Sequence, residues 1–413
     1  MKFIIYVAVA IFSLSSFAQE TVNVMFYNLL NFPDTAPGGR SEILRNIFTE
    51  FKPDLFLVCE LQNESGADEI LNISLNYSTN NYSRADFVTN QSGSNSLQQL
   101  LYYNNEKFLL ESSEILLTPI RDINKYVLKL NTLDQASDPI LIYIYVAHLK
   151  SSQGSSNENL RLEMVNEFTA DIENLNPNSF VLFAGDFNLY SSQEPAYQEI
   201  LDTSNAIVMV DPINTPGAWH NNEDFQDIHT QSTRLSSGPN GGASGGLDDR
   251  FDFITISENM ITNQNISYVS NSYKALGNNE NCYNLDISDE TCIGEYSQTL
   301  RNQLYSMSDH LPVIMKLETT KEFILNNQDF SSVKDLKIYN TLVSDNLTLV
   351  IQNSLQNRAS IYIFNMLGQK VKTITTNNNN NNNTIQINTS DLESGLYFLM
   401  SDELNGIQKF LKI

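Results

Sequence analysis

The sequence is poor in several residue types that would mark a particular class of protein. Its 413 residues include only 3 cysteines, 1 tryptophan and 4 histidines. No two cysteines stand in the CxxC spacing of structural zinc sites, which argues against a thiolate-bound metal. The Walker A, zinc-protease and GxGxxG motifs are missing as well. The sequence therefore indicates neither a P-loop protein nor a zinc protease nor a dinucleotide-binding domain.

Basic residues are scarce too. The chain has 24 Lys and Arg against 48 Asp and Glu, a formal net charge of −24. Non-specific binding to nucleic acid comes mostly from Lys and Arg neutralising phosphates, so such a surface disfavours tight non-specific binding. A bound cation can still reverse the field locally, which leaves a nucleic-acid substrate open.

Only one long apolar run is present, and it lies at the start of the chain. It extends from Phe3 to Leu14 after Lys2 and is followed by Ser15, Ser16, Phe17 and Ala18. This arrangement is typical of a secretory signal peptide. A membrane anchor would need roughly 20 apolar residues. We expect residues 1–18 to be removed on export, with no stable membrane insertion afterwards.

Residues 19–318 have the pattern of one large domain. Apolar runs of β type alternate with two amphipathic stretches, Ile43 to Phe51 and Leu160 to Leu175, which predict helices. Several runs are apolar on nearly every residue, as in strands that are covered on both faces. We expect an α/β (α+β) fold, a four-layer sandwich of two packed β-sheets flanked by helices. The predicted strands are Val22 to Leu29, Leu55 to Cys59, Ile140 to Ala147, Phe180 to Ala184, Phe251 to Ile256 and Leu311 to Leu317.

The last part of the chain has a different sequence pattern. After a predicted linker at 319–335, residues 336–413 show strand patterns without helical periodicity, which indicates a small all-β domain. Its predicted strands are Ser360 to Met366, Thr384 to Asn388, Leu396 to Met400 and Gln408 to Ile413. The polyasparagine run from Asn377 to Asn383 is interpreted as a hairpin loop or local disorder.

Polar residues with catalytic potential lie where the predicted strands of the large domain begin or end. If these strand ends meet at one edge, they gather carboxylates, amides and imidazoles. Such oxygen ligands suit Mg²⁺ or Mn²⁺, and imidazoles transfer protons near neutral pH. The residues are Asn28, Glu60, His148, Asp186, Asn188, Asp252, Asp309 and His310.

The surrounding motifs, taken in order, resemble the endonuclease/exonuclease/phosphatase superfamily, which has the fold of pancreatic-type deoxyribonuclease. They cover nearly all of residues 20–318. The matching segments are Phe26-Tyr27-Asn28, Pro53-Asp54 through Cys59-Glu60, Ala147-His148-Leu149-Lys150-Ser151, Gly185-Asp186-Phe187-Asn188, Asp249-Arg250-Phe251-Asp252-Phe253 and Ser308-Asp309-His310-Leu311-Pro312.

The resemblance implies a role for each residue. Asn28, Glu60 and Asp309 would hold Mg²⁺ or Mn²⁺. Asp186, steadied by Asn188, would align and deprotonate the attacking water. His310, oriented by Asp252, and His148 would stabilise the negative charge of the transition state as imidazolium groups.

Other polar residues carry weaker signals. Lys150 and Ser151 follow His148 closely enough to line the site, and Arg234 ends a donor-rich segment that begins at His229. Lys150 and Arg234 are candidates for substrate binding. Surface roles are expected for His220 and His229. Arg161 lies off the apolar stripe of its helix and is expected to be a surface residue or a structural ion-pair partner. Residues 242–246 fit GxSxG, but they precede a strand in a Gly-rich loop, so no serine hydrolase is indicated.

The cysteines fit an exported protein. Cys282 and Cys292 lie close together in a polar loop and are predicted to form a disulfide in an oxidising compartment, whereas Cys59 is expected to be buried.

The tail resembles a type IX secretion C-terminal sorting domain. The segments that carry this resemblance are Ile361 to Val371, Leu392, Gly395-Leu396-Tyr397 and Lys409 to Ile413. It implies the type IX secretion machinery as a partner and a location outside the cell or on the outer cell surface. A β-sandwich adhesion or carbohydrate-binding module is the alternative.

Three functions compete. A secreted metal-dependent phosphodiester hydrolase acting on DNA or RNA, that is, an extracellular nuclease, agrees best with the motifs. The alternative is a sphingomyelinase-like phospholipid diesterase or another phosphatase of the superfamily. Lipid hydrolysis would need an apolar surface that enters the membrane, and Trp219 is the only tryptophan in the sequence that could contribute to one. A catalytically inactive surface binding protein ranks last, because every motif residue is present.

Overall fold

The structure is a computed structural model that describes residues 19–239, 241–324, 336–338, 341–351, 359–376, 384–401 and 408–413. The predicted signal peptide, the polyasparagine run and most of the predicted linker lie outside these ranges. The chain divides into two compact units, Met1–Ile324 and Leu325–Ile413. This division falls within the predicted linker at 319–335.

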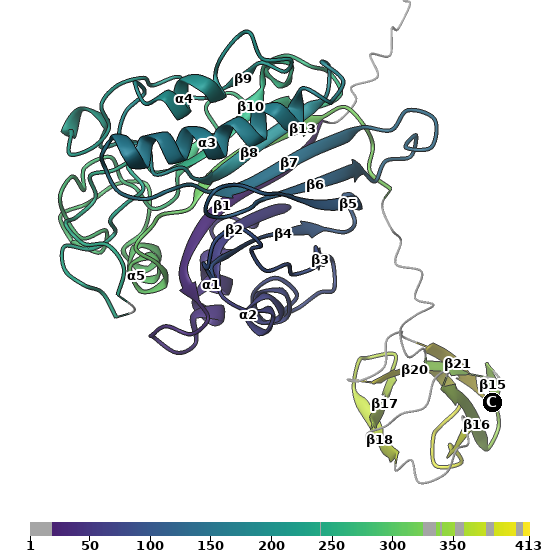
Figure 1. The fold of residues 1–413 in the computed structure, drawn as a ribbon. Coiled ribbons are helices and arrows are strands. Elements are labelled where there is room, and N and C mark those ends of the chain that lie inside the picture. Colours follow the sequence, from purple (N-terminus) through teal and green to yellow (C-terminus); the bar gives the residue numbers. More distant parts are fainter. Residues whose placement is uncertain are drawn as a thin grey trace, which may run out of the picture. The chain divides into compact units, whose positions relative to one another are not determined.

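Two β-sheets pack face to face in the first unit (Figure 1). The first sheet has the strand order β11-β13-β1-β2-β4-β3, with β12 paired to β13, and the second has the order β5-β6-β7-β8-β10-β9. The first sheet contains β1 (Glu20–Phe32), β2 (Leu55–Leu61), β3 (Tyr82–Arg84), β4 (Gln98–Asn104), β11 (Ser267–Tyr268), β12 (Lys274–Ala275) and β13 (Val313–Thr319). The second contains β5 (Phe108–Leu116), β6 (Ile123–Leu130), β7 (Leu141–His148), β8 (Phe180–Asp186), β9 (Met209–Val210) and β10 (Asp252–Ser257).

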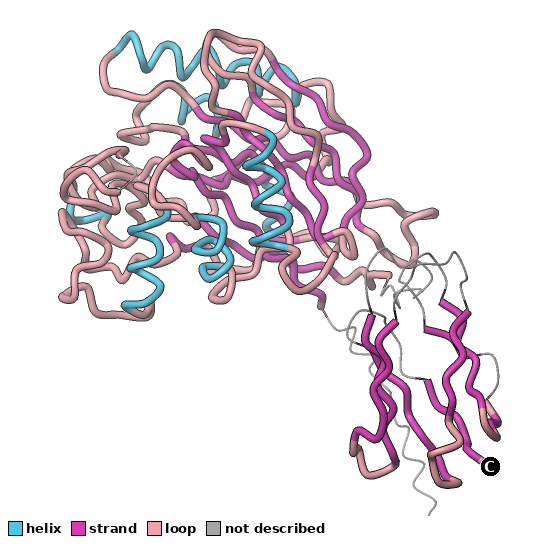
Figure 2. The backbone as a smooth tube through the Cα atoms, turned by 90° about the horizontal axis from the view of Figure 1, so that it is seen from below, coloured by secondary structure: helices cyan, strands magenta, loops and turns pink. Residues whose placement is uncertain are grey.

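Helices cover the outer faces of both sheets, as the tube view also shows (Figure 2). On the first sheet lie α1 (Arg40–Ile47), α2 (Glu64–Glu69), the π-helix at Ile70–Leu75 and α5 (Gln298–Met307). On the second lie α3 (Ser155–Ile172) and α4 (Pro195–Ile200). Short 3₁₀ turns occur at Glu223–Phe225 and Glu258–Ile261. The predicted four-layer fold is confirmed.

Strand β7 illustrates why this sequence folds into layers. Ile142, Ile144 and Val146 pack into the cluster between the two sheets, whereas Tyr145 and Ala147 pack into the cluster beneath α3 and α4. Alternate side chains point to opposite faces of a strand, so a run that is apolar throughout must be covered on both sides. The contact between helix and sheet is tight, since the rings of Phe168 and Phe183 stack with centroids 4.0 Å apart.

Arg161 on α3 shows where sequence patterns underestimate burial. Its side chain is completely buried, and the guanidinium forms an ion pair with Glu194, with 2.6 Å between Nη2 and Oε2. It also donates to the backbone carbonyls of Lys150 and Ser152. The structural ion pair is therefore confirmed, and the surface alternative is wrong.

His229 and Trp219 are both fully buried, contrary to the predicted surface role of the histidine and to the use of the tryptophan as a lipid anchor. The imidazole Nε2 of His229 lies 2.9 Å from the carbonyl oxygen of Trp219, so this nitrogen carries the proton. The indole of Trp219 donates to the carbonyl of Thr215. Each side chain stabilises the loop between β9 and β10, and neither contacts solvent.

The burial of His229 predicts a loss of stability in mild acid. Burial lowers the pKa of His229 to about 4, whereas the unfolded chain protonates it near 6.5. The unfolded state therefore gains a proton first, and stability should fall by about 3 kcal/mol as the pH drops from about 6.5 to about 4. Urea unfolding at several pH values measures this, with His229→Gln as the variant that lacks the titration. Equal pH slopes in both proteins would contradict the prediction.

The second unit is all-β and contains two small sheets, β14-β16-β19 and β15-β21-β20-β17-β18. Its strands are β14 (Leu336–Ile338), β15 (Leu342–Val343), β16 (Asn346–Ile351), β17 (Ala359–Asn365), β18 (Lys370–Thr376), β19 (Thr384–Asn388), β20 (Gly395–Ser401) and β21 (Gln408–Lys412). Ile361, Ile363, Leu399 and Phe410 are among the residues of its buried core. Of the described helices in the chain, none combines the length and the apolar character required to cross a membrane.

Candidate functional site

Strand pairing brings the predicted residues together at one end of the first unit. In the parallel pair of β7 and β8, His148 lies opposite Asp186, and in the antiparallel pair of β8 and β10, Asp186 lies opposite Asp252. Parallel β1 and β2 place Asn28 opposite Cys59, beside Glu60. A cavity of about 420 Å³ opens there. Its walls include Glu60, Arg121, His148, Asp186, Asn188, Tyr190, Gln231, Asp309 and His310.

Asp186 is the centre of this cluster. Its Oδ1 accepts hydrogen bonds from the side chain and the backbone N–H of Asn188, at 2.8 and 3.1 Å. Its Oδ2 lies 3.4 Å from Nε2 of His148 and 3.8 Å from Nε2 of His310. Burial raises the pKa of Asp186 to about 7 although His310 opposes the shift, with Asp252 and Glu60 adding to it. A carboxylate with this pKa is suited to accept a proton near neutral pH.

Asn28 and Glu60 occupy the neighbouring wall. Oδ1 of Asn28 accepts from the backbone N–H of Leu30, which fixes the amide orientation, and Nδ2 donates to Glu60 and to Asp186, each at 3.0 Å. The metal-ligand role of Asn28 stays a prediction, because an amide oxygen that accepts one hydrogen bond keeps a second lone pair. In the structure its amide nitrogen also contacts two carboxylates.

The backbone at this edge is strained. Glu60 and Asn188 have φ values of 59° and 51°, and Leu30 and Asn31 near the end of β1 also have positive φ. For residues other than glycine this left-handed conformation costs of order 1–3 kcal/mol and persists only where the surroundings impose it. The backbone N–H of Asn31 donates to Oε2 of Glu60 at 3.1 Å, so the strained segment directly holds the carboxylate.

His310 is held by a buried carboxylate behind it. Its Nδ1 lies 2.7 Å from Oδ2 of Asp252, a residue with no solvent exposure. Burial alone would lower the pKa of His310, but Asp252, Asp309 and Asp186 raise it well above its ordinary value. This shift of the pKa favours the charged imidazole that the resemblance implies for His310.

His148 behaves differently. Its pKa lies well below the ordinary value, because the side chain is buried and because Arg121 and His310 add positive charge nearby. This environment favours a neutral imidazole, whereas the resemblance implies an imidazolium at this position. In this form His148 acts as a hydrogen-bond donor through one nitrogen only.

Asp309 is positioned by the Gly-rich loop. Its Oδ2 accepts from the backbone N–H of Ala243 at 2.6 Å and from the side chain of Gln231 at 3.3 Å. A Cβ atom on Gly242, whose φ is 86°, would lie 2.7 Å from Cγ of Asp309, so only glycine fits there. The GxSxG sequence therefore belongs to a loop that supports Asp309.

The acidic groups of the cavity fit a divalent metal. Among the residues that the structure describes, Glu60, Asp186 and Asp309 form no ion pair with Lys or Arg. Burial and the charge of Asp309 raise the pKa of Glu60, which shows that these carboxylates repel one another. Ligand atoms of Glu60, His148 and Asp186 lie within 4.8 Å of one another. Oxygen-rich donors of this kind suit Mg²⁺ or Mn²⁺.

The two predicted substrate-binding residues lie elsewhere. Arg234 is fully buried and donates to the backbone carbonyls of Tyr305 and Gly241, so it stabilises the Gly-rich loop and is not open to substrate. Lys150 is half-exposed and donates to the carbonyl of Ser151. Neither lines the cavity.

Several residues of the cavity wall had no predicted role, and Gln231, Arg121 and Tyr190 are three of them. Gln231 places Nε2 2.6 Å from Nε2 of His310, and it belongs to the donor-rich segment from which Arg234 was chosen. Arg121 donates from Nε to the carbonyl of His148 at 2.8 Å and adds the one guanidinium among the lining residues. Tyr190 follows Asn188 by two residues. Only the segment around Gln231 carried a sequence signal.

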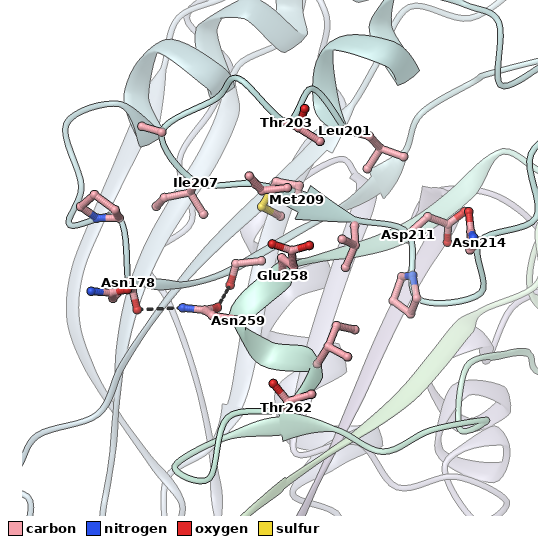
Figure 3. A pocket seen from close by; sticks show the side chains of 17 residues that line it. Asn178, Leu201, Thr203, Ile207, Met209, Asp211, Asn214, Glu258, Asn259 and Thr262 are labelled. Carbon is pink, nitrogen blue, oxygen red and sulfur yellow. Dashed lines mark hydrogen bonds between the residues drawn. The ribbon is translucent and has the colours of Figure 1, made fainter.

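A larger cavity of about 950 Å³ lies at the opposite ends of β8 and β10 (Figure 3). Asn178 before β8 and Ser257 at the end of β10 are among its lining residues, with Leu201, Ile207 and Met209. It holds Asp211, whose carboxylate is paired with Arg250 at 2.8 Å. The arrangement lacks the facing carboxylates and imidazoles of the smaller cavity, which we take as the candidate active site.

A disulfide lies beneath the Gly-rich loop. Cys282 and Cys292 are bonded, with Cα atoms 5.2 Å apart, and Cys59 is a buried free thiol. The enclosed segment supports the stretch that precedes the Gly-rich loop, since the N–H of Ile287 donates to the carbonyl of Thr233, and the N–H of Thr233 donates to that of Asp309.

We therefore expect the disulfide to affect both stability and catalysis. Replacing Cys282 and Cys292 by Ala should lower the free energy of unfolding by about 3 kcal/mol, because the bridge closes a short loop in the unfolded chain. Activity should fall as well, since the support of Asp309 loosens. Chemical unfolding and rate measurements check this, with Cys59→Ala as the control. Free thiols at 282 and 292 in the unreduced protein would contradict the prediction.

The second unit matches a known family of domains. Residues 335–413 match the family model described as "Secretion system C-terminal sorting domain", which confirms the predicted sorting domain and indicates a protein that is secreted or attached to the cell surface. No curated protein has a significantly similar sequence.

Several solved structures are similar to this chain. A humanized TDP2 from D. rerio is 14% identical, with a TM-score of 0.45, and the match covers 72% of this chain and 98% of that one. The human Nocturnin catalytic domain with bound sulfate is 15% identical, with 72% and 94% covered and a TM-score of 0.44. An endonuclease/exonuclease/phosphatase family protein from Bacteroides thetaiotaomicron is 14% identical, with 74% and 97% covered and a TM-score of 0.45.

Proposed function

We propose that the protein is a secreted phosphodiester hydrolase that depends on Mg²⁺ or Mn²⁺ and acts as a nuclease on DNA or RNA. One observation carries the proposal. The carboxylate of Asp186, held by Asn188, faces the imidazoles of His148 and His310 in a cavity that also contains Glu60 and Asp309. These groups match the needs of attack by water on a phosphate ester, in which a base and a set of charge-stabilising donors must meet at one phosphorus atom.

Asp186 is assigned the role of general base. Its pKa of about 7 leaves much of it deprotonated at neutral pH. Asn188 holds Oδ1 in place with two hydrogen bonds, and Oδ2, which accepts one hydrogen bond from Asn28, is assigned to accept the proton from water. His310, kept protonated by Asp252, and the neutral His148 donate hydrogen bonds to the phosphoryl oxygens.

The acidic wall completes the site. A divalent ion held by Glu60 and Asp309 would offset the negative charge of the phosphate and polarise it towards attack. Arg121 supplies a fixed positive charge on the same cavity wall. The side-chain amide of Gln231 lies against both Asp309 and His310, between the metal-binding side and the hydrogen-bonding side of the cavity.

Nucleic acid is preferred to lipid as the substrate. Lipid hydrolysis needs an apolar surface that enters a membrane, and the one tryptophan, Trp219, is buried. The inactive binding protein is disfavoured because the residues of the site converge in one cavity with perturbed pKa values, which is typical of catalysis.

A panel of substrates tests the proposal. The mature chain, from residue 19, is given plasmid DNA, RNA, sphingomyelin vesicles and an aryl phosphodiester with Mg²⁺ or Mn²⁺. We expect cleavage of DNA or RNA and of the aryl ester. Because the net charge is −24, few contacts along the polyanion are available, and the rate should fall only gently as salt is raised. Hydrolysis of sphingomyelin without any cutting of DNA or RNA would overturn the nuclease assignment.

A further inference from the structure

A second group of metal-ligating side chains lies outside the candidate active site. It consists of His220, Asp248 and Asp249, and one ligand atom from each lies within 4.8 Å of the others. Nδ1 of His220 is 2.7 Å from Oδ1 of Asp249. None of the three residues lines the cavity of the candidate active site.

The backbone fixes this group before any ligand binds. The N–H groups of Asp248 and Asp249 both donate to the carbonyl of Gln231, at 2.9 and 2.8 Å. The N–H of Asn221, the residue after His220, donates to the carbonyl of Asp248 at 2.8 Å. These bonds hold two loop segments side by side, so the three side chains are already close together before a ligand binds.

In the part of the chain that the structure describes, His220 is the one cationic partner of the two carboxylates in this group. Among the described residues, neither Asp248 nor Asp249 forms an ion pair with Lys or Arg, and the carboxylate of Asp248 accepts no hydrogen bond. Asp249 is only 9% exposed. Carboxylates this buried are normally paired with a cation or coordinate a metal. Burial raises the pKa of both groups, and Asp248 contributes to the shift at Asp249.

We propose that His220, Asp248 and Asp249 form a second divalent-cation site, selective for ions such as Zn²⁺ that accept imidazole and carboxylate together. One imidazole and two carboxylates are ligands of this class. Atoms bonded to one tetrahedral zinc ion at roughly 2.1 Å lie about 3.4 Å apart, so a small movement apart of His220 and Asp249, which now lie 2.7 Å apart, would admit the ion in place of the proton between them. The side chain of His220 is 40% exposed, so an ion can enter and retain water as a further ligand.

The second cation site lies next to the candidate active-site cavity. The ring of His220 meets that of Tyr190 edge to face at 5.2 Å, and Tyr190 lines the candidate active site. A bound cation would therefore add positive charge next to the cavity of a strongly acidic protein. The existence of the site does not depend on the proposed function, because it is tested by binding alone.

The only tryptophan makes the test direct. Trp219 precedes His220, and its fluorescence should be quenched by Co²⁺, a paramagnetic ion that occupies zinc sites. The mature chain is titrated with Co²⁺, then with Zn²⁺ in competition, and bound Zn²⁺ is counted after ultrafiltration. The variants are His220→Ala and the isosteric Asp248→Asn. Glu223→Gln, which removes an exposed carboxylate nearby, is the control for net charge, and Asp309→Asn disables the candidate active-site metal.

The expected results separate the two sites. Wild type, Glu223→Gln and Asp309→Asn should show saturable quenching that Zn²⁺ reverses. His220→Ala and Asp248→Asn should each bind one Zn²⁺ fewer per chain. In both variants the Co²⁺ affinity measured by quenching should fall at least about tenfold, and the circular dichroism spectrum should not change. Equal zinc content and equal quenching in wild type and in both site variants would overturn the proposal. If His220→Ala unfolds, Asp248→Asn decides the outcome: a folded Asp248→Asn protein with the zinc content of wild type would also overturn the proposal.

Discussion

Asp186→Asn is expected to lower the rate of phosphodiester hydrolysis roughly 10²–10⁴-fold, the range that general base catalysis supplies. Asparagine has the shape of aspartate but cannot accept a proton from water. His310→Ala should cause a loss of roughly 10²–10³-fold, because the imidazolium that Asp252 holds towards the cavity disappears. Both are measured as kcat with an aryl phosphodiester, which avoids effects on the binding of long nucleic acids.

The folded state should survive these changes. The carboxylates of the cavity repel one another, so removing one charge relieves strain, although the amide in Asp186→Asn offers one acceptor oxygen fewer to the side chain of Asn28. Circular dichroism and thermal unfolding verify this. Asp202→Asn, which alters an exposed carboxylate outside the cavity, is the control and should retain full activity. Wild-type turnover in both Asp186→Asn and His310→Ala would exclude the proposed site.

Asp309→Asn should have effects of opposite sign on activity and on stability. The amide side chain can accept from Ala243 and Gln231 through its oxygen and donate to Ser308 through its nitrogen, so the hydrogen bonds of Asp309 are preserved. The negative charge is lost, and with it a metal ligand whose contribution is several kcal/mol, or roughly a thousandfold in rate. In chelator, the melting temperature should rise, because repulsion of Glu60 disappears.

Asp54→Asn is the matched control for this result. Asp54 is a buried carboxylate far along the chain from Asp309, but it is paired with Lys107 at 2.8 Å and accepts from the backbone of Asn23. Its neutralisation should lower the free energy of unfolding by about 1–3 kcal/mol and leave kcat unchanged. If Asp309→Asn were destabilised in the same way, the carboxylates of the cavity would not be the uncompensated cluster described above.

The site is predictable from the sequence largely because its residues lie at the ends of strands. His148 and Asp186 end β7 and β8, and Asp252 begins β10, so the pattern of apolar runs is enough to find them. Glu60 is found because it follows the first apolar residues of β2. The left-handed backbone at Glu60 and Asn31 was not predictable, since it follows from the register shift between β1 and β2.

The errors share one physical cause, which is burial of polar side chains by loops. Local patterns predict surface or substrate-binding roles for Arg234, Arg161 and His229, because charged and polar side chains are usually exposed. In the structure each is buried and bonded to backbone or to a buried partner. Such partners come from distant loops, so local sequence patterns do not reveal them. Gln231 was missed for the same reason, because its contacts with Asp309 and His310 span 78 and 79 residues.

Strands β4 to β6 were also missed from the sequence. β4 begins with Gln98 and Gln99, which are buried but polar, and β5 contains Ser112, Ser113 and Glu114 on a half-exposed edge strand. A strand is predicted from apolar runs or strict alternation, and neither is clear here. Gln99 is accommodated in the core because its amide donates to the carbonyl of Asp122.

Addition of Mg²⁺ to the chelator-treated mature chain, with hydrolysis of an aryl phosphodiester followed in wild type and in Asp186→Asn, tests the central claim most directly. We predict no hydrolysis before the metal is added, saturable recovery in wild type as Mg²⁺ or Mn²⁺ is titrated in, and no recovery in Asp186→Asn. Hydrolysis at the full rate in chelator, or none with either metal, would contradict the assignment of the cavity as a metal-dependent phosphodiesterase site.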